Sequence, residues 1–509
     1  MTERYQLLAR SLAKRMGWRV NEETPWDKVI GLFSLNSIDY MMSTFAVHRL
    51  SGIVTPSNAM YSAAELEHQL KSSGAKALIT CIPLLETALK ASRACNIPDD
   101  KVFIIRLPGK FDPVPFKSLD DLIDEGRSLP ELEPLIWSKG QGARQVAYLC
   151  YSSGTSGLPK AVMIAHRNVI ANVMQLRWHE DTGRRMKGVE TQVQLGLLPF
   201  SHIYGLVVIA QSGTYRGDEV VVLPKFELTA LLGVPPIVIQ MLRNPKICSK
   251  YDLSSLRFVY TGAAPLGAET HEEMVKAFPF LQVGQGYGMT ETSTVVTSTG
   301  ENDVVVGTSG SLAPACRAKL IGEDGHEITE YDKRGELWVQ SPSVTLGYLN
   351  NERATSEAYV WDHDGRWIRT GDVAIVTKSP SGNEHISVVD RLKELIKVKG
   401  HQVAPAELEA HLLSHPDVND CTVIPIPDEG SGEVPKAFVV KSAMAASRPE
   451  NEVASEINKW VEDHKARYKW LKGGIEFIDA VPKSPSGKIL RRLLKDQERE
   501  KRRAKGAKL

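Results

Sequence analysis

The sequence predicts an α/β protein with a large, multi-layer N-terminal domain of β-sheets covered by helices and a small, mobile α+β C-terminal domain. Its 509 residues are enough for more than one domain. Short β-rich runs alternate with helical patterns through the first half, which is typical of a sheet covered by helices. The final stretch has a different order of elements. We therefore place the boundary at Arg391, with domains at 1–390 and 391–509.

The predicted elements of the large domain begin with a helix in residues 1–18. Leu7, Leu8 and Leu12 recur there among charged residues, which is an amphipathic pattern rather than a signal peptide. A second helix is predicted over 62–74. Strands are predicted in the β-branched runs at 76–80, 101–105, 145–150 and 256–262.

Two later segments, 335–349 and 384–400, are rich in β-branched and aromatic residues, which predicts a β-rich region. The small domain then has its own alternation of helical and strand patterns. Its helices are predicted over 405–416 and 451–464, and its strands over 421–428 and 436–440.

Composition excludes several classes of protein. Hydrophobic residues make up 42% and charged residues 24%, which is ordinary for a globular protein, and the net charge of +1 argues against a nucleic-acid-binding protein. The cysteines are scattered without metal-ligand spacing, which favours reduced thiols inside a cell. They lie at 81, 95, 150, 248, 316 and 421. No apolar run is long enough to form a transmembrane segment.

The stretch "YSSGTSGLPKAVMIAH" (151–166) combines glycines and hydroxyl side chains with Lys160. Glycines allow backbone N–H groups to approach an anion closely, so the loop suits the phosphates of a nucleotide. It lacks the Gly-Lys-Ser/Thr ending of the common nucleotide-triphosphatase loop. Taken alone, a flexible surface connection is about as good an interpretation.

Other motifs follow in order. In "GQGYGMTET" (284–292), Thr290 and Glu291 suit a Mg²⁺ that is bridged to phosphate oxygens. Asp372 in "RTGD" could accept hydrogen bonds from ribose hydroxyls. A basic segment spans 390–403, and Lys488 follows a Ser/Pro/Gly loop in "PKSPSGKILRR". Alone, each would more often be a helix cap or a solvated face.

Together and in this order, these motifs make the chain resemble the AMP-forming acyl-CoA synthetase superfamily, which includes firefly luciferase and peptide-synthetase adenylation domains. It looks most similar to the 4-coumarate–CoA ligase-like branch. The resemblance runs through nearly the whole chain. It implies a ligase that uses ATP and Mg²⁺ to convert a carboxylic acid into an acyl adenylate and then transfers the acyl group to coenzyme A.

The resemblance also implies roles for residues. The loop would close over the β- and γ-phosphates of ATP through Ser152, Ser153, Gly154, Thr155, Ser156, Gly157 and Lys160. Thr290 would contact phosphate and Glu291 would hold Mg²⁺. The nucleoside would meet Tyr287 at adenine, and Asp372 and Arg391 at the ribose.

Catalysis in the family implies a moving small domain. Lys488 would bridge both reactants while the adenylate forms, and rotation about Lys393 would then bring the region from Lys397 to Gln402 to the site. His202 would lie beside the acyl carboxylate, although a histidine in such a place is usually a core or loop residue.

The acyl pocket implied by the resemblance takes residues from three motifs: Tyr204, Gly205, Val208, Ala263 and Gly286. Plant hydroxycinnamate ligases commonly have a polar residue at the position that matches Val208. A valine offers no hydrogen bond to a phenol, which favours an apolar aryl or medium-chain acid.

The chain departs from the family pattern at two places. The first helix begins at residue 4, where the family has several tens of earlier residues. The segment 223–242 runs from a helix start to "VPP", so that a helix and a core strand are expected to be missing near Gly233. An inactive, truncated pseudoenzyme is therefore one alternative. The others are a luciferase-like oxygenase and a carrier-loading enzyme, and no carrier module follows to support the second.

The C-terminal tripeptide Ala507-Lys508-Leu509 differs by one residue from the peroxisomal signal Ser-Lys-Leu. It predicts binding to a peroxisomal import receptor and a peroxisomal location. The alternative is a solvated basic tail on a cytoplasmic protein.

Overall fold

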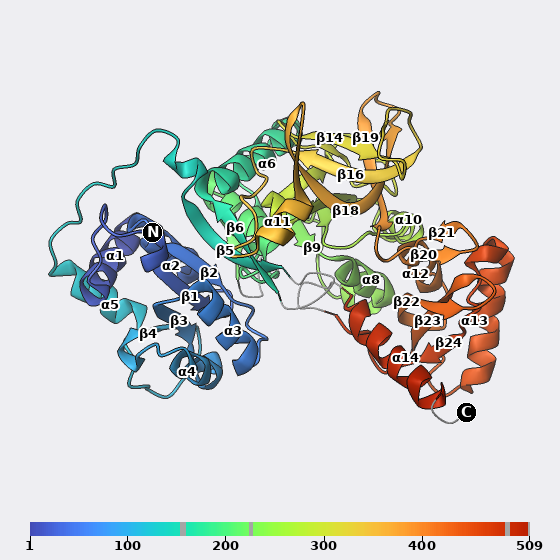
Figure 1. Cartoon of the computed structure of the whole chain (residues 1–509), viewed down its shortest axis with the longest axis horizontal. Coiled ribbons are helices and arrows are strands. Elements are labelled where there is room, and N and C mark those ends of the chain that lie inside the picture. Colours follow the sequence, from blue (N-terminus) through green and yellow to red (C-terminus); the bar gives the residue numbers. More distant parts are fainter. Residues whose placement is uncertain (153–158, 223–227, 484–488, 507–509) are drawn as a thin grey trace.

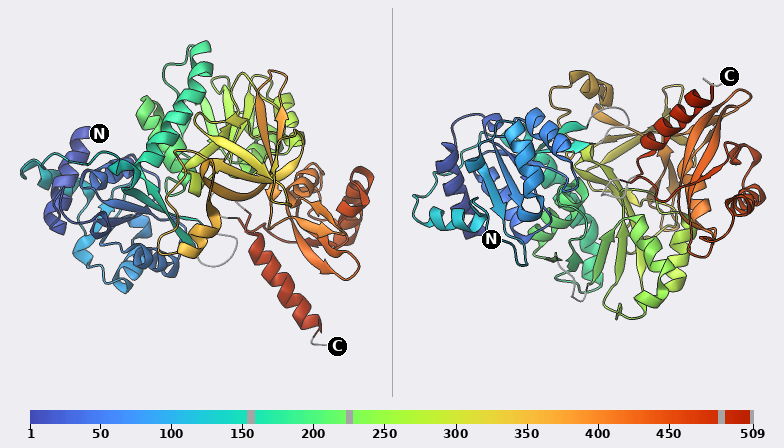
Figure 2. Two further views of the ribbon diagram at one scale, coloured as in Figure 1. Left: turned by 45° about the horizontal axis from the view of Figure 1, so that its top comes forward. Right: turned by 90° about the horizontal axis from the view of Figure 1, so that it is seen from below.

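The computed structural model describes residues 1–152, 159–222, 228–483 and 489–506. The N-terminal sheet and its helices lie at one end of the molecule, the small C-terminal domain lies at the other, and the remaining sheets lie between them (Figure 1). Two further views show the same order along the long axis (Figure 2). The predicted α/β architecture, a large sheet-based domain with a smaller one after it, is confirmed.

The first sheet is parallel except at β6, which is antiparallel to β5. Its central strands are apolar and buried along their whole length, as expected for parallel strands covered on both faces. In spatial order the strands are β4 (Val102–Ile105), β3 (Ala77–Cys81), β1 (Val29–Phe33), β2 (Ile53–Pro56), β5 (Val146–Ser152) and β6 (Lys160–Ala165).

Helix α1 packs against α2 and α5 through Leu7, Leu8 and Leu12, which are buried. The next predicted helix forms as α3, where Ser62 and Glu65 make a capping box. The helices around this sheet are α1 (Thr2–Met16), α2 (Ile38–Arg49), α3 (Ala63–Ser73), α4 (Leu85–Ala94) and α5 (Leu119–Arg127).

The second sheet has a parallel centre, and β12 and β13 continue it in antiparallel fashion. Its spatial order is β13 (Ser311–Leu312), β12 (Thr294–Ser298), β11 (Gln282–Met289), β10 (Phe258–Thr261), β9 (Ala230–Gly233), β7 (Val193–Leu195) and β8 (Glu219–Val221). Its helical segments are α6 (His166–Met186), the π-helix η5 (Tyr204–Gln211), α7 (Ser212–Arg216), α8 (Pro235–Arg243), α9 (Pro245–Cys248) and α10 (Ala268–Ala277).

The presence of strand β9 shows that one expectation from the sequence is wrong. A core strand was expected to be missing near Gly233, but Ala230–Gly233 pair in parallel with β10, and Ala230 pairs with Gln194 of β7. The apolar run "ALLG" is therefore the core strand that was expected to be missing. The described residues between β8 and β9, which are 222, 228 and 229, are not helical.

The third sheet is antiparallel. Its spatial order is β15 (Glu327–Ile328), β14 (Arg317–Ile321), β16 (Arg334–Gln340), β18 (Gly365–Lys378) and β17 (Tyr359–Asp362), and β19 (Glu384–Arg391) also pairs with β18. The short helix α11 (Glu352–Ala358) precedes β17. Strand β19 then leads directly toward the C-terminal domain.

The C-terminal domain has its own core, formed where α12 and α13 pack on a sheet. The sheet order is β21 (His401–Val403), β20 (Ile396–Val398), β23 (Gly432–Lys441) and β22 (Val418–Asp428), with β24 (Ile475–Phe477) paired to β23. The helices are α12 (Pro405–Leu413), α13 (Glu450–His464) and α14 (Arg491–Gly506). Within the described part of the chain, no helix has the length and apolar character needed to cross a membrane.

We predict that Leu232→Ala in β9 lowers the stability of the large domain by about 2–4 kcal/mol, because it opens a cavity in the core between two paired strands. Leu232 is only 6% exposed and lies opposite Tyr260 of β10. The matched control is Leu197→Ala, because Leu197 is 50% exposed. Urea denaturation followed by tryptophan fluorescence compares the two, and equal transition midpoints would contradict the placement of β9 in the core.

Candidate active site

The candidate site lies at the carboxyl ends of the neighbouring strands β10 and β11, which is the usual place for a site in a parallel sheet. Residues from the second and third sheets meet there. Tyr287 comes from β11, Asp372 from β18 and Arg391 from β19. Glu291 follows β11 in a short 3₁₀ turn, and Lys160 begins β6.

Tyr287, Asp372 and Arg391 form a connected group. The Tyr287 hydroxyl donates a hydrogen bond to Asp372 Oδ2 at 2.6 Å, and Arg391 Nε lies 3.6 Å from Asp372 Oδ1. Burial and the Asp372 carboxylate raise the pKa of Tyr287 well above its ordinary value, so its hydroxyl remains a donor. The structure thus brings together the residues that the sequence assigns to the adenosine part of ATP.

Glu291 and Lys160 both lie near Tyr348. The buried Glu291 accepts a hydrogen bond from the Tyr348 hydroxyl at 2.9 Å, and Lys160 Nζ lies 5.1 Å from the centre of the Tyr348 ring. Burial raises the pKa of Tyr348 above its ordinary value. A carboxylate held in place beside a lysine suits a hard cation and the phosphates that it bridges, so the side chains fit Mg²⁺-ATP. Tyr348 could not be predicted from the sequence, because nothing in its surrounding residues marks it.

The glycine-rich loop is anchored at both ends. Ser152 of β5 and Lys160 of β6 are paired in antiparallel register, so the segment between them connects two adjacent strands. The predicted phosphate contacts at Ser153, Gly154, Thr155, Ser156 and Gly157 lie outside the described residues, as does Lys488. Thr290 is half-buried, next to Glu291.

The predicted acyl pocket lies along η5. Tyr204 packs its ring near Gly262, and its buried hydroxyl has no hydrogen-bond partner among the described residues. Burial raises the pKa of that hydroxyl well above its ordinary value. Val208 is buried in the core cluster, and the backbone of Gly205 lies against the Pro199 carbonyl. His202 lies two residues before η5, and its Nδ1 accepts a hydrogen bond from the Tyr204 backbone N–H at 3.3 Å.

The side chain of a tyrosine passes so close to residue 286 that only a glycine fits there. The Tyr260 hydroxyl reaches over Gly286 to donate to Ser298 Oγ at 2.8 Å, and a Cβ on residue 286 would lie 1.9 Å from that hydroxyl. Ala263 follows β10 with φ +68°, a left-handed conformation that is uncommon for alanine and typical of functional sites. Tyr260 is therefore a site residue that the sequence pattern did not indicate.

Lys393 lies two residues beyond Arg391, whereas Lys397 and Gln402 belong to the β20–β21 hairpin. Lys393 and Lys397 are exposed, and Gln402 donates a hydrogen bond to Glu323, in the turn between β14 and β15. The tip of the β20–β21 hairpin is also exposed. Among the described residues, no atom lies within 4 Å of a Cβ built on Gly400. In the observed orientation of the small domain, the hairpin is therefore not at the site.

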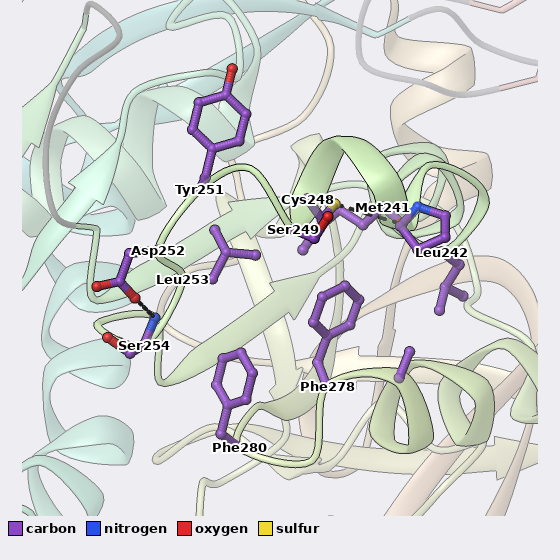
Figure 3. Close-up of a pocket in the computed structure, with 12 residues that line it drawn as sticks. Met241, Leu242, Cys248, Ser249, Tyr251, Asp252, Leu253, Ser254, Phe278 and Phe280 are labelled. Atoms are coloured by element: carbon purple, nitrogen blue, oxygen red, sulfur yellow. Dashed lines mark hydrogen bonds between the residues drawn. The ribbon is translucent and has the colours of Figure 1, made fainter.

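A pocket of about 630 Å³ lies at the opposite ends of the strands (Figure 3). Its lining includes Leu253, which precedes β10, and Phe278 and Phe280, which precede β11. These are the amino ends of strands whose carboxyl ends form the candidate site. The pocket is thus separate from the group around Tyr287.

Comparison with protein families identifies both domains. Residues 1–349 match the family model described as AMP-binding enzyme, and residues 407–488 match the AMP-binding enzyme C-terminal domain. The chain belongs to the AMP-binding enzyme family.

Relatives match along nearly the whole chain. Acyl-CoA ligase AFT1-1 of Alternaria alternata is 40% identical over 97% of this chain and 87% of its own length. Acyl-CoA ligase easD of Emericella nidulans is 39% identical over 97% of this chain and 90% of its own length. With the family match, these relatives make this chain an AMP-forming acid–CoA ligase that uses ATP and coenzyme A.

Solved structures have the same fold. The anthranilate CoA ligase AuaEII, in complex with anthranoyl-AMP, superposes with a TM-score of 0.81 at 23% identity, over 97% of this chain and 91% of that one. A benzoate CoA ligase from Burkholderia xenovorans superposes with a TM-score of 0.78 at 22% identity, over 97% and 93%. At this identity the likeness establishes the fold alone.

We predict that Gly286→Ala destabilises the protein by about 1–3 kcal/mol, because the new Cβ would force Tyr260 away from Ser298. In a Tyr260→Ala background the same change should cost less than about 0.5 kcal/mol, since the clash is gone. Thermal unfolding of the four proteins gives the coupling. Gly300→Ala is the control, because its nearest atom lies at 3.9 Å. If the effects of Gly286→Ala and Tyr260→Ala on stability are additive, the Tyr260 side chain does not pass over Gly286 as described.

Proposed function

We propose that this AMP-forming acid–CoA ligase acts on an apolar aryl or medium-chain carboxylic acid. In the first half-reaction, an oxygen of the acid attacks the α-phosphorus of ATP, and the bond to pyrophosphate breaks. In the second, the thiolate sulfur of coenzyme A attacks the acyl carbon of the adenylate. The bond to AMP then breaks, and a thioester remains.

The residues of the site have separate roles in the first half-reaction. Tyr287, Asp372 and Arg391 hold the adenosine part of ATP, since the carboxylate of Asp372 is already oriented by Tyr287. Glu291 holds Mg²⁺ and Lys160 contacts the phosphates at the other end of the site. When bound, Mg²⁺ neutralises phosphate charge in the transition state. Lys488 bridges the reacting groups, as the family resemblance implies.

The second half-reaction needs a different orientation of the small domain. Rotation about Lys393 would remove Lys488 from the site and bring the hairpin from Lys397 to Gln402 toward the acyl adenylate. The exposed tip of this hairpin is consistent with an orientation that precedes the rotation. We therefore propose that the observed orientation serves the formation of the adenylate.

The proposal that the acid has an apolar body rests on the apolar surface of η5. Its buried residues from Tyr204 to Ala210 include no charged side chain, and Val208 offers no hydrogen bond. An acid with an apolar body would pack well on this surface. The Tyr204 hydroxyl is a buried donor in the same place, so acids with and without one oxygen substituent both belong in the test.

We predict that pyrophosphate release, assayed across a panel of acids, is fastest with apolar aryl or medium-chain acids. Short and dicarboxylic acids should be at least about tenfold slower in kcat/KM, because the site offers them less apolar contact or no partner for a second charge. Coupled thioester formation without light emission would exclude a luciferase-like reaction. A preference for short or dicarboxylic acids would overturn the proposed acid class.

We also propose that the chain is imported into peroxisomes through Ala507-Lys508-Leu509. The proposal rests on the sequence of the tripeptide alone, because these residues lie outside the described part of the chain.

We predict that a fluorescent protein fused to the N-terminus locates to peroxisomes in a fungal cell. Deleting residues 507–509, or adding one residue after Leu509, should return the fusion to the cytosol, because the import receptor reads a free C-terminus. Fluorescence microscopy against a peroxisomal marker compares the three fusions. Equal distribution of all three would reject the signal.

A further inference from the structure

Arg243, the last residue of α8, joins the large domain to the small one. One of its guanidinium nitrogens donates to the Asn419 backbone carbonyl at 2.5 Å and to Asn419 Oδ1 at 2.8 Å. The other donates to the carbonyls of Val418 at 2.6 Å and Leu413 at 3.3 Å. A single side chain of the large domain thus holds four acceptors of the small domain.

The acceptors explain why an arginine suits this position. Leu413 is the last residue of α12, where backbone carbonyls lack helical partners and the helix dipole is negative. The other backbone acceptors, the carbonyls of Val418 and Asn419, lie at the start of β22. The planar guanidinium reaches the helix end and the strand start at once, which a lysine cannot do in the same geometry. Burial lowers the pKa of Arg243 from its ordinary value, which means that burial disfavours the charge. The carbonyl and amide oxygens that accept its hydrogen bonds offset part of that cost.

A second contact lies in the same interface. Gly267, which caps the start of α10, packs against α12, and a Cβ on residue 267 would lie 2.8 Å from the Ala410 Cβ. The two domains therefore fit closely in this orientation at both α8 and α10.

This interface belongs to one orientation of the small domain. Its acceptors lie in residues 413–419, which are beyond the rotation point at Lys393, whereas Arg243 and Gly267 lie in the large domain. Any large rotation about Lys393 moves α12 away from both residues. The hydrogen bonds of Arg243 must then break.

We propose that Arg243 is a positioning residue that holds the small domain in the adenylate-forming orientation. The inference rests on the proposed function, in which two half-reactions use two orientations. Arg243 contributes to the first half-reaction by raising the population of the orientation that it needs. It contributes nothing to the second.

The test compares the two half-reactions in Arg243→Met. Acid-dependent exchange of pyrophosphate into ATP should fall about five- to twentyfold, because the adenylate-forming orientation is less populated. Thioester formation from supplied acyl adenylate and coenzyme A should stay within about twofold of wild type. The control is Arg185→Met, since Arg185 is 76% exposed on α6 and should change neither rate.

Gly267→Ala tests the same interface by the opposite means, because it adds a clash with Ala410 and removes no attraction. It should shift the ratio of the half-reactions in the same direction as Arg243→Met. Gly430→Ala is the matched control, because Gly430 is exposed and its nearest atom lies at 3.7 Å. Equal losses in both half-reactions, or an unchanged ratio in both variants, would overturn the proposal.

A measurement without substrate separates failure of this proposal from failure of the proposed function. Fluorescent labels at Trp361 and Met444, which are 74% and 72% exposed, report the distance between the domains by energy transfer. Arg243→Met should broaden the distribution of distances, and an unchanged distribution would overturn the role of Arg243 even if no acid supports activity. If the distribution broadens but the wild-type protein activates no acid, the proposed function fails and the domain contact stands.

Discussion

The hydrogen bond from Tyr287 to Asp372 is the interaction on which the arrangement of the site depends. It joins β11 of the second sheet to β18 of the third, and Arg391 beside it lies on the strand that leads to the C-terminal domain. Because Tyr287 is buried, its hydroxyl remains a donor and the Asp372 carboxylate has a fixed orientation. A nucleotide held here would lie at the junction of both sheets and at the base of the moving domain.

The short connection between β8 and β9 shows how this fold adapts to a shorter chain. Strand β9 keeps its place between β10 and β7, so the sheet is continuous. It pairs with β10 along its whole length and with β7 at Ala230. Helix α8 begins two residues after β9 ends, at Pro235. The C-terminal end of α8 then carries Arg243 to the small domain. The order of the strands, rather than the length of the crossover, positions the site and the interface.

Sequence patterns predicted the local elements well, because periodicity and capping depend on neighbouring residues. Strands β3, β4, β5 and β10 and helix α3 lie where those patterns indicated. The run "ALLG" was misread, since a short apolar segment does not distinguish a buried strand from the edge of a helix. The predicted partners Tyr287, Asp372 and Arg391 meet, as the order of motifs implied. Tyr348, Tyr260 and Arg243 could not be found this way, because their roles come from contacts with residues far away in the sequence.

In the proposed reaction, the acid is activated by attack of its own oxygen on the α-phosphorus of ATP. The most direct measurement uses an acid whose carboxylate carries ¹⁸O, with ATP, Mg²⁺ and coenzyme A, followed by mass spectrometry of the products. When the bond between the acyl group and AMP breaks in the second half-reaction, one labelled oxygen should remain in the phosphate of AMP. Label in inorganic phosphate, or ADP in place of AMP, would contradict the account.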